Sequence, residues 1–337
     1  MIDMATVSDI FLLLGSITVF LFGLKKLSAD TGELCGGKLD YFVRKATSNR
    51  FGGVLAGMIS TSVLQSSVAT NVIAITLVEK GVIDFFACAA VVMGTNIGTT
   101  ITGQLVSLSA VFDFEPSAIG GVIAFIGMIL SLFNNKKVKS AGGALLGFGF
   151  LFVGLGMMTE SAANFKKYYW FTSLFLVENP VVLFLNGLVV TAILQSSSVV
   201  TSIIIVLSSV GLVSFDSAAF LILGANVGTC LPVIIASADM SEQSRKSAYF
   251  NLAFNIFGTL LFFFPLLSDK FIGAIPFFNT PDTGRNIANF HSFFNLAVCV
   301  VMLPILKPFC RLTEKIFAFF DRPKGARKTR RKSEVNA

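Results

Sequence analysis

Long stretches without a charged residue alternate with short charged segments along most of the chain. Nine runs of at least 15 residues contain no Asp, Glu, Lys or Arg: 10–24, 51–78, 85–112, 116–135, 140–159, 179–215, 217–238, 247–268 and 286–306. A helix needs about 20 apolar residues to cross the hydrocarbon core of a membrane. The pattern therefore predicts an all-α polytopic membrane protein.

Two of these runs have polar residues at their centres. They read "TSVLQSSVATN" at 61–71 and "TAILQSSSVVTS" at 191–202. Ser competes with the helix backbone for hydrogen bonds, and irregular backbone inside a membrane persists only where protein or a wet cavity surrounds it. Each segment is typical of a re-entrant helical hairpin with a Gln-Ser-Ser tip, and we place the hairpins at about 51–78 and 179–208.

The two polar segments belong to an internal repeat. Shifting the sequence by 130 positions aligns 57–100 with 187–230, and 16 of the 44 pairs are identical. The Gln-Ser-Ser and Gly-x-Asn-x-Gly-Thr positions recur, whereas the apolar positions between them vary. We predict a first repeat at 1–135, a second at 136–268, an additional transmembrane helix at 269–310 and a basic cytoplasmic tail at 311–337.

Lys and Arg predict the orientation of the chain. If both polar segments are hairpins and every other run crosses once, 22 of the 26 Lys and Arg residues lie on one side. Positively charged loops are cytoplasmic, so we predict a protein of a bacterial inner membrane with its C-terminus on the cytoplasmic side. Treating the hairpins as full spans gives 20 against 6, a slightly weaker bias. With hairpins, the two repeats have inverted topology and their tips approach the bilayer midplane from opposite sides.

Composition narrows the function to transport. The charged fraction is 13%, about half that of a soluble domain, and mean hydropathy is +0.79. No phosphate-binding Gly-Lys-Ser/Thr motif of an ATPase is present, and no carboxylate pair, metal cluster or nucleophile set supports an enzyme. A basic tail after a membrane helix favours contact with anionic lipid over nucleic acid. The five Cys residues follow no metal spacing.

The polar centres suit small ions. Broken helices expose N–H groups that bind anions, and Ser hydroxyls add rotatable donors. Amide, hydroxyl and backbone oxygens also suit an alkali cation. The residues indicate a secondary transporter that couples an anion to a cation. Two alternatives stay open: transport of another oxyanion, and an anion channel, whose flux would not depend on a sodium gradient. Any single Ser, Thr, Gln or Asn also serves as a hydrogen bond between helices.

The strings "LQSSVATN" and "LQSSSVVTS", followed by "GTNIGT" and "GANVGT", resemble the type II sodium-phosphate cotransporters and their bacterial relatives over about residues 8 to 306. The resemblance implies sodium-coupled transport of inorganic phosphate by alternating access, with both ions bound between two hairpin tips. It implies Na⁺ as the coupling ion and no organic cofactor. The phosphate ligands that it implies are Ser66, Ser67, Asn96, Ser196, Ser197, Ser198 and Asn226. The sodium ligands that it implies are Gln65, Thr99, Gln195 and Thr229.

The chain departs from that pattern in places. Val68 replaces the third Ser of the first motif, and Cys230 stands opposite Thr100, so the two halves of the site are expected to be unequal. Bacterial relatives often carry a domain resembling the phosphate-signalling protein PhoU, which we do not expect here. The oligomeric state stays open, with a homodimer as the form considered. We interpret Arg285 as a cation at the end of a span, with attraction of phosphate as the alternative. We interpret His291 as a packed residue, with proton coupling as the alternative.

Overall fold

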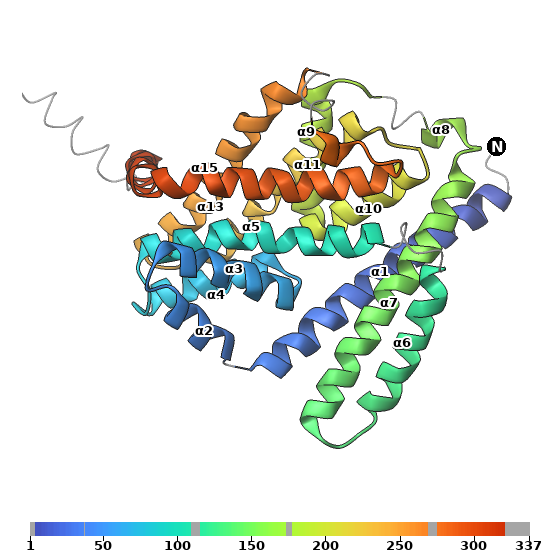
Figure 1. Cartoon of the computed structure of the whole chain (residues 1–337), viewed down its shortest axis with the longest axis horizontal. Coiled ribbons are helices and arrows are strands. Elements are labelled where there is room, and N and C mark those ends of the chain that lie inside the picture. Colours follow the sequence, from blue (N-terminus) through green and yellow to red (C-terminus); the bar gives the residue numbers. More distant parts are fainter. Residues whose placement is uncertain (1–3, 37, 109–114, 173–176, 269–274, 321–337) are drawn as a thin grey trace, which may run out of the picture.

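A computed structural model describes residues 4–36, 38–108, 115–172, 177–268 and 275–320, and within these ranges the regular elements are helices (Figure 1). The predicted all-α class is confirmed. Among the described residues, six segments are long and apolar enough to cross a membrane. They are α1 (Met4–Cys35), α5 (Phe85–Leu108), α7 (Lys136–Phe165), α11 (Phe215–Gly228) with α12 (Cys230–Ser237), α13 (Glu242–Leu266) and α15 (Thr283–Phe320).

The remaining helices are shorter. They are α2 (Lys38–Ala46), α3 (Arg50–Leu64), α4 (Ser67–Glu79), α6 (Pro116–Ser131), α8 (Tyr169–Thr172), α9 (Pro180–Leu194), α10 (Ser197–Ser209) and the 3₁₀ turn η2 (Pro276–Phe278). The run 116–135 was expected to cross once, but α6 has 16 residues and is about 24 Å long. The last helix continues past the predicted start of the tail at 311, because Thr313 and Phe317 pack inward and Phe317 lies against Tyr249 of α13.

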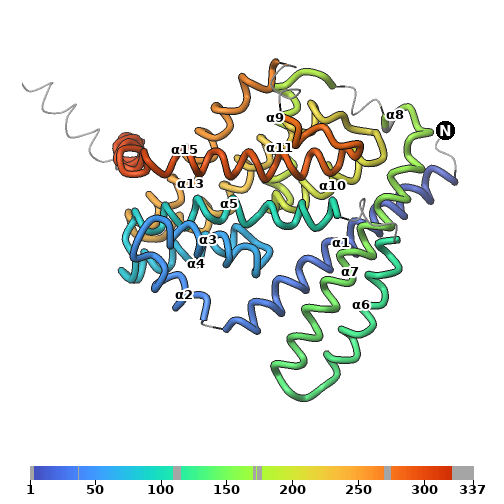
Figure 2. Tube along the Cα trace, in the orientation of Figure 1, coloured from blue at the N-terminus to red at the C-terminus, as the bar shows by residue number. Residues whose placement is uncertain are grey.

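Helices α1, α6 and α7 form a three-helix unit at the right of Figure 1, and Figure 2 shows the same grouping along the trace. Glycines allow this close approach. A Cβ on Gly147 would collide with the backbone of Leu27, and one on Gly149 with the backbone of Ala124. Removing side chains at such contacts lets membrane helices pack backbone to backbone. The unit meets the rest of the chain mainly where α1 contacts α3 and α7 contacts α10.

The remaining helices form a second unit, in which α5 and α15 lie side by side across its middle. Aromatic rings hold α15 against α13; the rings of Phe262 and Phe294 are 5.1 Å apart in an edge-to-face arrangement. Glu79 at the end of α4 accepts hydrogen bonds from Ser241 N (2.9 Å) and Ser244 Oγ (2.6 Å) at the start of α13. These bonds hold the pKa of the Glu79 carboxyl below its ordinary value of 4.5.

The repeat seen in the sequence recurs in the packing of α3 on α5 and of α9 on α11. A Cβ on Gly94 would collide with Val54 O, and one on Gly224 with Phe184 O, which is the same contact 130 residues later. Gly57 and Gly187 repeat this relation with the carbonyls of Val91 and Leu221. The recurring glycines therefore fix the same helix spacing in both halves.

Each short hairpin also packs against the other half: α4 contacts α12, and α10 contacts α5. The predicted equivalence of the closing spans is not seen. Helix α6 packs chiefly on α7, whereas α13 contacts α4, α5, α11, α12 and α15.

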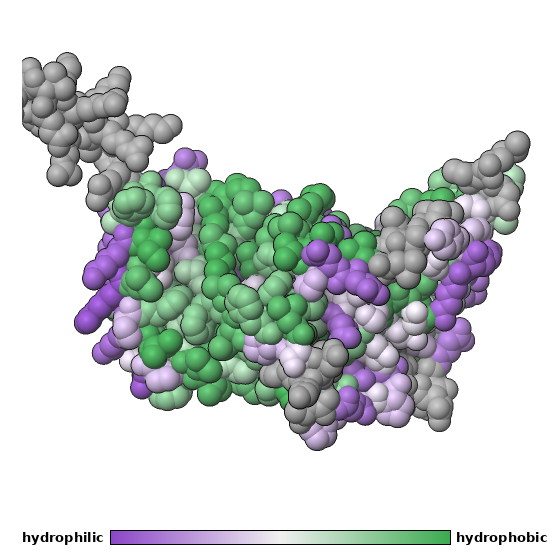
Figure 3. All heavy atoms as spheres, turned by 90° about the horizontal axis from the view of Figure 1, so that it is seen from above, coloured by the Kyte–Doolittle hydropathy of each residue, from purple (hydrophilic) through white to green (hydrophobic). Residues whose placement is uncertain are grey.

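The surface in Figure 3 is hydrophobic over much of one face, with hydrophilic residues gathered toward its two ends. The exposed apolar side chains include Val122, Phe125 and Met128 of α6 and Val300 of α15. An exposed apolar belt is what contact with lipid tails requires. The side from which each hairpin enters the bilayer, and the inverted orientation of the two halves, stay predictions.

Candidate functional site

The two Gln-Ser-Ser segments break their helices in the same way. Gln65 has φ 51° and ψ 27°, and Gln195 has φ 56° and ψ 24°. They are the two non-glycine residues with positive φ in the described chain. The left-handed conformation costs an ordinary residue roughly 1–2 kcal/mol, and such strain persists where the surrounding structure enforces it, often at binding sites.

The serine after each Gln starts the next helix. Ser66 is extended at φ −149°, and its Oγ accepts from Ala69 N at 3.2 Å. Ser196 is extended at φ −152°, and its Oγ accepts from Val199 N at 3.4 Å. Ser67 and Ser197 are then the first residues of α4 and α10. The serines among the predicted phosphate ligands thus lie at two helix N-termini, where backbone N–H groups and the helix dipole favour an anion.

The tips of the two halves meet at Thr102 of α5. Thr102 Oγ1 donates to Gln65 Oε1 at 2.7 Å and lies 3.4 Å from Ser198 Oγ. Thr102 is 1% exposed and Ser198 is 5% exposed, so this polar contact is enclosed by protein. Thr102 is not marked by the repeat in the sequence, because its counterpart 130 residues later is Pro232.

The remaining predicted ligands lie on α5 and at the end of α11. The amides of Asn96 and Asn226 are buried and donate to the carbonyls of Val92 (3.0 Å) and Ile222 (3.2 Å). Thr99 donates to Thr95 O at 2.8 Å, and Thr229 donates to Asn226 O at 2.6 Å. Each Asn amide thus retains a second N–H donor for an anion, while the hydroxyl oxygens of Thr99 and Thr229 retain lone pairs for a cation.

A matched pair of hydroxyls lies one helical turn before the tips. Thr61 and Thr191 are 1% and 0% exposed, and among the described residues their Oγ1 atoms have no hydrogen-bond partner. Thr61 lies against Gly98 and Thr191 against Gly228, beside the predicted ligands Thr99 and Thr229. Buried hydroxyls are normally paired, so a matched unpaired set indicates a ligand or water. The repeat alignment had paired these threonines, but nothing in the sequence marked them as ligands.

The two tips differ in burial. Gln195 is exposed, whereas Gln65 is partly buried and bonded to Thr102 and to Ser62 O (2.6 Å from Nε2). Ser197 and Ser198 are buried, whereas Ser66 and Ser67 are partly exposed. The expected inequality of the two halves therefore appears in their surroundings as well as in their residues.

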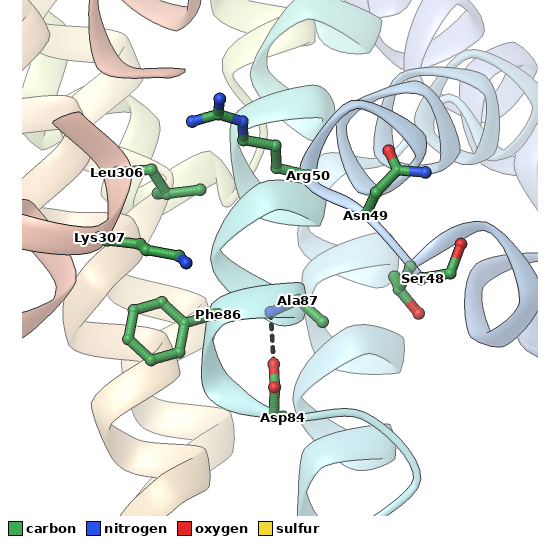
Figure 4. Close-up of a pocket in the computed structure, with 9 residues that line it drawn as sticks. Ser48, Asn49, Arg50, Asp84, Phe86, Ala87, Leu306 and Lys307 are labelled. Carbon is green, nitrogen blue, oxygen red and sulfur yellow. Dashed lines mark hydrogen bonds between the residues drawn. The ribbon is translucent and has the colours of Figure 1, made fainter. Parts of the chain in front are cut away.

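One surface pocket lies away from these tips. Figure 4 shows it at the start of α3 and α5, with Arg50, Asp84 and Lys307 around a space of about 510 Å³. Arg50 Nη1 donates to Leu303 O of α15 at 2.9 Å, and Asp84 Oδ1 caps α5 by accepting from Ala87 N at 2.7 Å. Both of these residues have structural roles. Within the described chain no cluster of three His, Cys, Asp or Glu side chains is placed to hold a metal ion.

Comparisons with known proteins give a matching family and several relatives. The family model for the Na⁺/Pi-cotransporters matches residues 19–160 and 172–276. The uncharacterized protein YqeW of Bacillus subtilis is 27% identical over 299 residues, which cover 88% of this chain and 94% of YqeW. The putative inorganic phosphate export protein YjbB of Escherichia coli is 23% identical over 309 residues, which cover 90% of this chain and 55% of YjbB.

A third relative comes from a mammal. The sodium-dependent phosphate transport protein 2A of Rattus norvegicus is 33% identical over 105 residues, which cover 30% of this chain and 16% of the rat protein. The chain thus spans nearly all of one relative, about half of the second and a small part of the third. No solved structure matches it.

Proposed function

The chain belongs to the Na⁺/Pi-cotransporter family, a family of transporters rather than enzymes, and on this premise we propose that it carries inorganic phosphate across a membrane, coupled to sodium. The observation that supports this most directly is the Thr102 contact, which brings the tip of one half to the tip of the other. Phosphate then binds between two helix N-termini that belong to different halves of the molecule.

In this proposal phosphate oxygens accept from the N–H groups at the starts of α4 and α10. The hydroxyls of Ser66, Ser67, Ser196, Ser197 and Ser198 and the amides of Asn96 and Asn226 complete the phosphate shell. Thr102 orients Gln65 and Ser198 toward it. No Lys or Arg lies in α4 or α10, so sodium supplies the positive charge that offsets the anion.

Sodium binds neutral oxygens beside each tip. Gln65 and Thr99 serve the first half, and Gln195 and Thr229 serve the second. The unpaired hydroxyls of Thr61 and Thr191 lie beside these residues and add one oxygen to each set. Alternating access then exposes the shared phosphate position to one side of the membrane at a time.

The test is uptake of labelled phosphate into proteoliposomes with and without an inward sodium gradient. We expect uptake that requires sodium, and its loss in Ser196→Ala and in Gln195→Ala. Ser131→Ala is the matched control, since Ser131 bonds only within α6, to Met128 O, and lies far from the motifs in sequence. Sodium-independent flux would favour a channel. Equal competition by sulfate would favour a transporter of oxyanions in general.

Export is a second candidate direction, favoured by the name of YjbB, a relative aligned over 90% of this chain. Loading the vesicles with phosphate and imposing an outward sodium gradient tests it. Efflux that requires sodium would show that the same site works in both directions, with the gradient setting the direction of net transport.

A further inference from the structure

His291 of α15 is buried without a hydrogen-bond partner. Its side chain is 1% exposed, and among the described residues neither Nδ1 nor Nε2 makes a hydrogen bond. Leaving a buried polar group unpaired costs about 1–3 kcal/mol, so it is retained where it has a role. A partner from outside the chain accounts for both unpaired nitrogens.

Other polar groups of the same α5–α15 interface are paired. Gln104 Nε2 donates to Ala288 O (3.0 Å) and Ser292 Oγ (2.8 Å), and Arg285 Nη1 donates to Ser107 Oγ (3.1 Å). The interface therefore satisfies side chains of similar polarity on both sides of His291. The unpaired imidazole is a local exception rather than a general feature of this packing.

The imidazole lies beside the contact between the two tips. A Cβ on Gly103, the residue after Thr102, would lie 3.8 Å from His291 Nδ1 and 3.6 Å from Thr201 Cγ2. Thr201 is three residues after Ser198 on α10, is 1% exposed and also has an unpaired hydroxyl in the described chain. His291 and Thr201 thus both approach Gly103, one residue along α5 from the Thr102 contact.

Imidazole adds a chemical property that the tips lack. The motif supplies N–H groups and hydroxyls, which donate to any tetrahedral oxyanion. An imidazolium would have no carboxylate partner in α5 or α10, which contain no Asp or Glu. A neutral imidazole has one N–H donor and one acceptor nitrogen without a proton. Near neutral pH inorganic phosphate is a mixture of forms with two and with one P–OH group, since its second ionisation lies at about pH 6–7. Both forms can donate a proton, whereas sulfate carries none.

We propose that His291 selects hydrogenphosphate over sulfate, its acceptor nitrogen taking the hydrogen bond of the anion's P–OH group directly or through one water. Thr201 donates its hydroxyl to the same ligand. The inference rests on the proposed transport function, because the anion must occupy the space between the tips. With sulfate, the acceptor nitrogen of His291 faces an oxygen lone pair where phosphate presents a P–OH proton. Sulfate therefore binds more weakly, as expected where a buried acceptor is left unpaired.

The experiment measures labelled phosphate and labelled sulfate uptake, each with the other anion as competitor, in purified protein in proteoliposomes. We expect His291→Leu to reduce the preference for phosphate by about tenfold, the value of one buried hydrogen bond. His291→Asn and His291→Gln keep a carbonyl acceptor and should retain much of the preference. Thr201→Val should raise KM for both anions by a similar factor, because a hydroxyl donor serves either of them.

Each result separates this inference from the proposed function. Absence of sodium-dependent phosphate uptake in the wild type would overturn the proposed function itself. Normal wild-type transport with an unchanged phosphate-to-sulfate ratio in His291→Leu would overturn the role of His291 alone. His291→Met is the second variant if leucine prevents folding, since methionine adapts to irregular buried space and offers only a weak acceptor. A fall in both uptakes at a constant ratio indicates a packing role and contradicts the inference.

Discussion

At the scale of single residues, the candidate site combines positions that the sequence singles out with one position, Thr102, that it does not. Gln65, Ser66, Gln195 and Ser196 could be predicted from the sequence, because polar residues inside apolar runs have few uses and these recur 130 residues apart. Their local conformations, left-handed then extended, agree within a few degrees between the halves. Thr102 could not be predicted, since a lone threonine in an apolar helix is ordinary until its neighbours are known.

Thr102→Val should raise the KM for phosphate by roughly tenfold, because it removes the hydroxyl that bonds to Gln65 and contacts Ser198 while keeping the side-chain shape. Thr102→Ser keeps the hydroxyl and should stay near the wild-type value. Uptake kinetics at saturating sodium measure both variants. A wild-type KM in Thr102→Val would mean that the contact between the tips is incidental to binding.

At the scale of elements, the sequence located two helix breaks closely and the other boundaries less well; the re-entrant arrangement of these helix pairs stays a prediction. The pairs α3–α4 and α9–α10 end within about one residue of the predicted hairpins. The charge-free run 116–135 extends four residues beyond α6, which ends at Ser131, because charge-free length alone does not show where a helix ends. The sequence also placed the end of the last helix at 310, since the inward positions Thr313 and Phe317 are recognised only once α13 is beside them.

The repeated glycines make a prediction at this scale. Gly224→Ala should prevent stable folding, because its Cβ would collide with the backbone carbonyl of Phe184, and backbone cannot move aside as a flexible side chain does. Gly94→Ala should do the same against Val54 O. Gly121→Ala is the control, since a Cβ there meets nothing within 4 Å. The unfolding temperature, determined by heating samples and measuring the remaining monodisperse protein by size-exclusion chromatography, compares all three variants with the wild type. A Gly224→Ala protein with wild-type stability would contradict this packing.

At the scale of the whole molecule, α1, α6 and α7 form one glycine-packed unit and the tips belong to the other. Composition predicted a membrane protein but not this division, because lipid-facing and helix-facing positions are equally apolar. Hydrophobic burial therefore leaves a weaker sequence signal here than in a soluble core. The division does not test the inverted topology, which depends on how the chain lies in the bilayer.

Cysteine labelling tests that topology. With hairpins, Lys45→Cys and Lys137→Cys lie on the same side of the membrane and Lys166→Cys lies opposite; these three positions are exposed at the surface. An impermeant maleimide applied to intact cells should label only Lys166→Cys, in a background where the partly exposed Cys35 is replaced. Labelling of Lys137→Cys from the side opposite Lys45→Cys would contradict the predicted topology: either the first Gln-Ser-Ser segment spans the membrane completely or the segment 116–135 does not cross it.

The bridge at Thr102 has no equivalent in the other half. Its counterpart is Pro232, and the counterpart of Ser198 is Val68, so the matching pair lacks hydroxyls although α4 and α12 are also in contact. Under the proposed alternating access, two identical halves would give the ligand-free protein two end states of equal energy. In that proposal one arrangement gains hydrogen bonds that the other cannot form, so the resting population would be biased before any ion binds. Substrate would then supply the difference, and this inequality would set the face of the membrane to which the ligand-free protein opens.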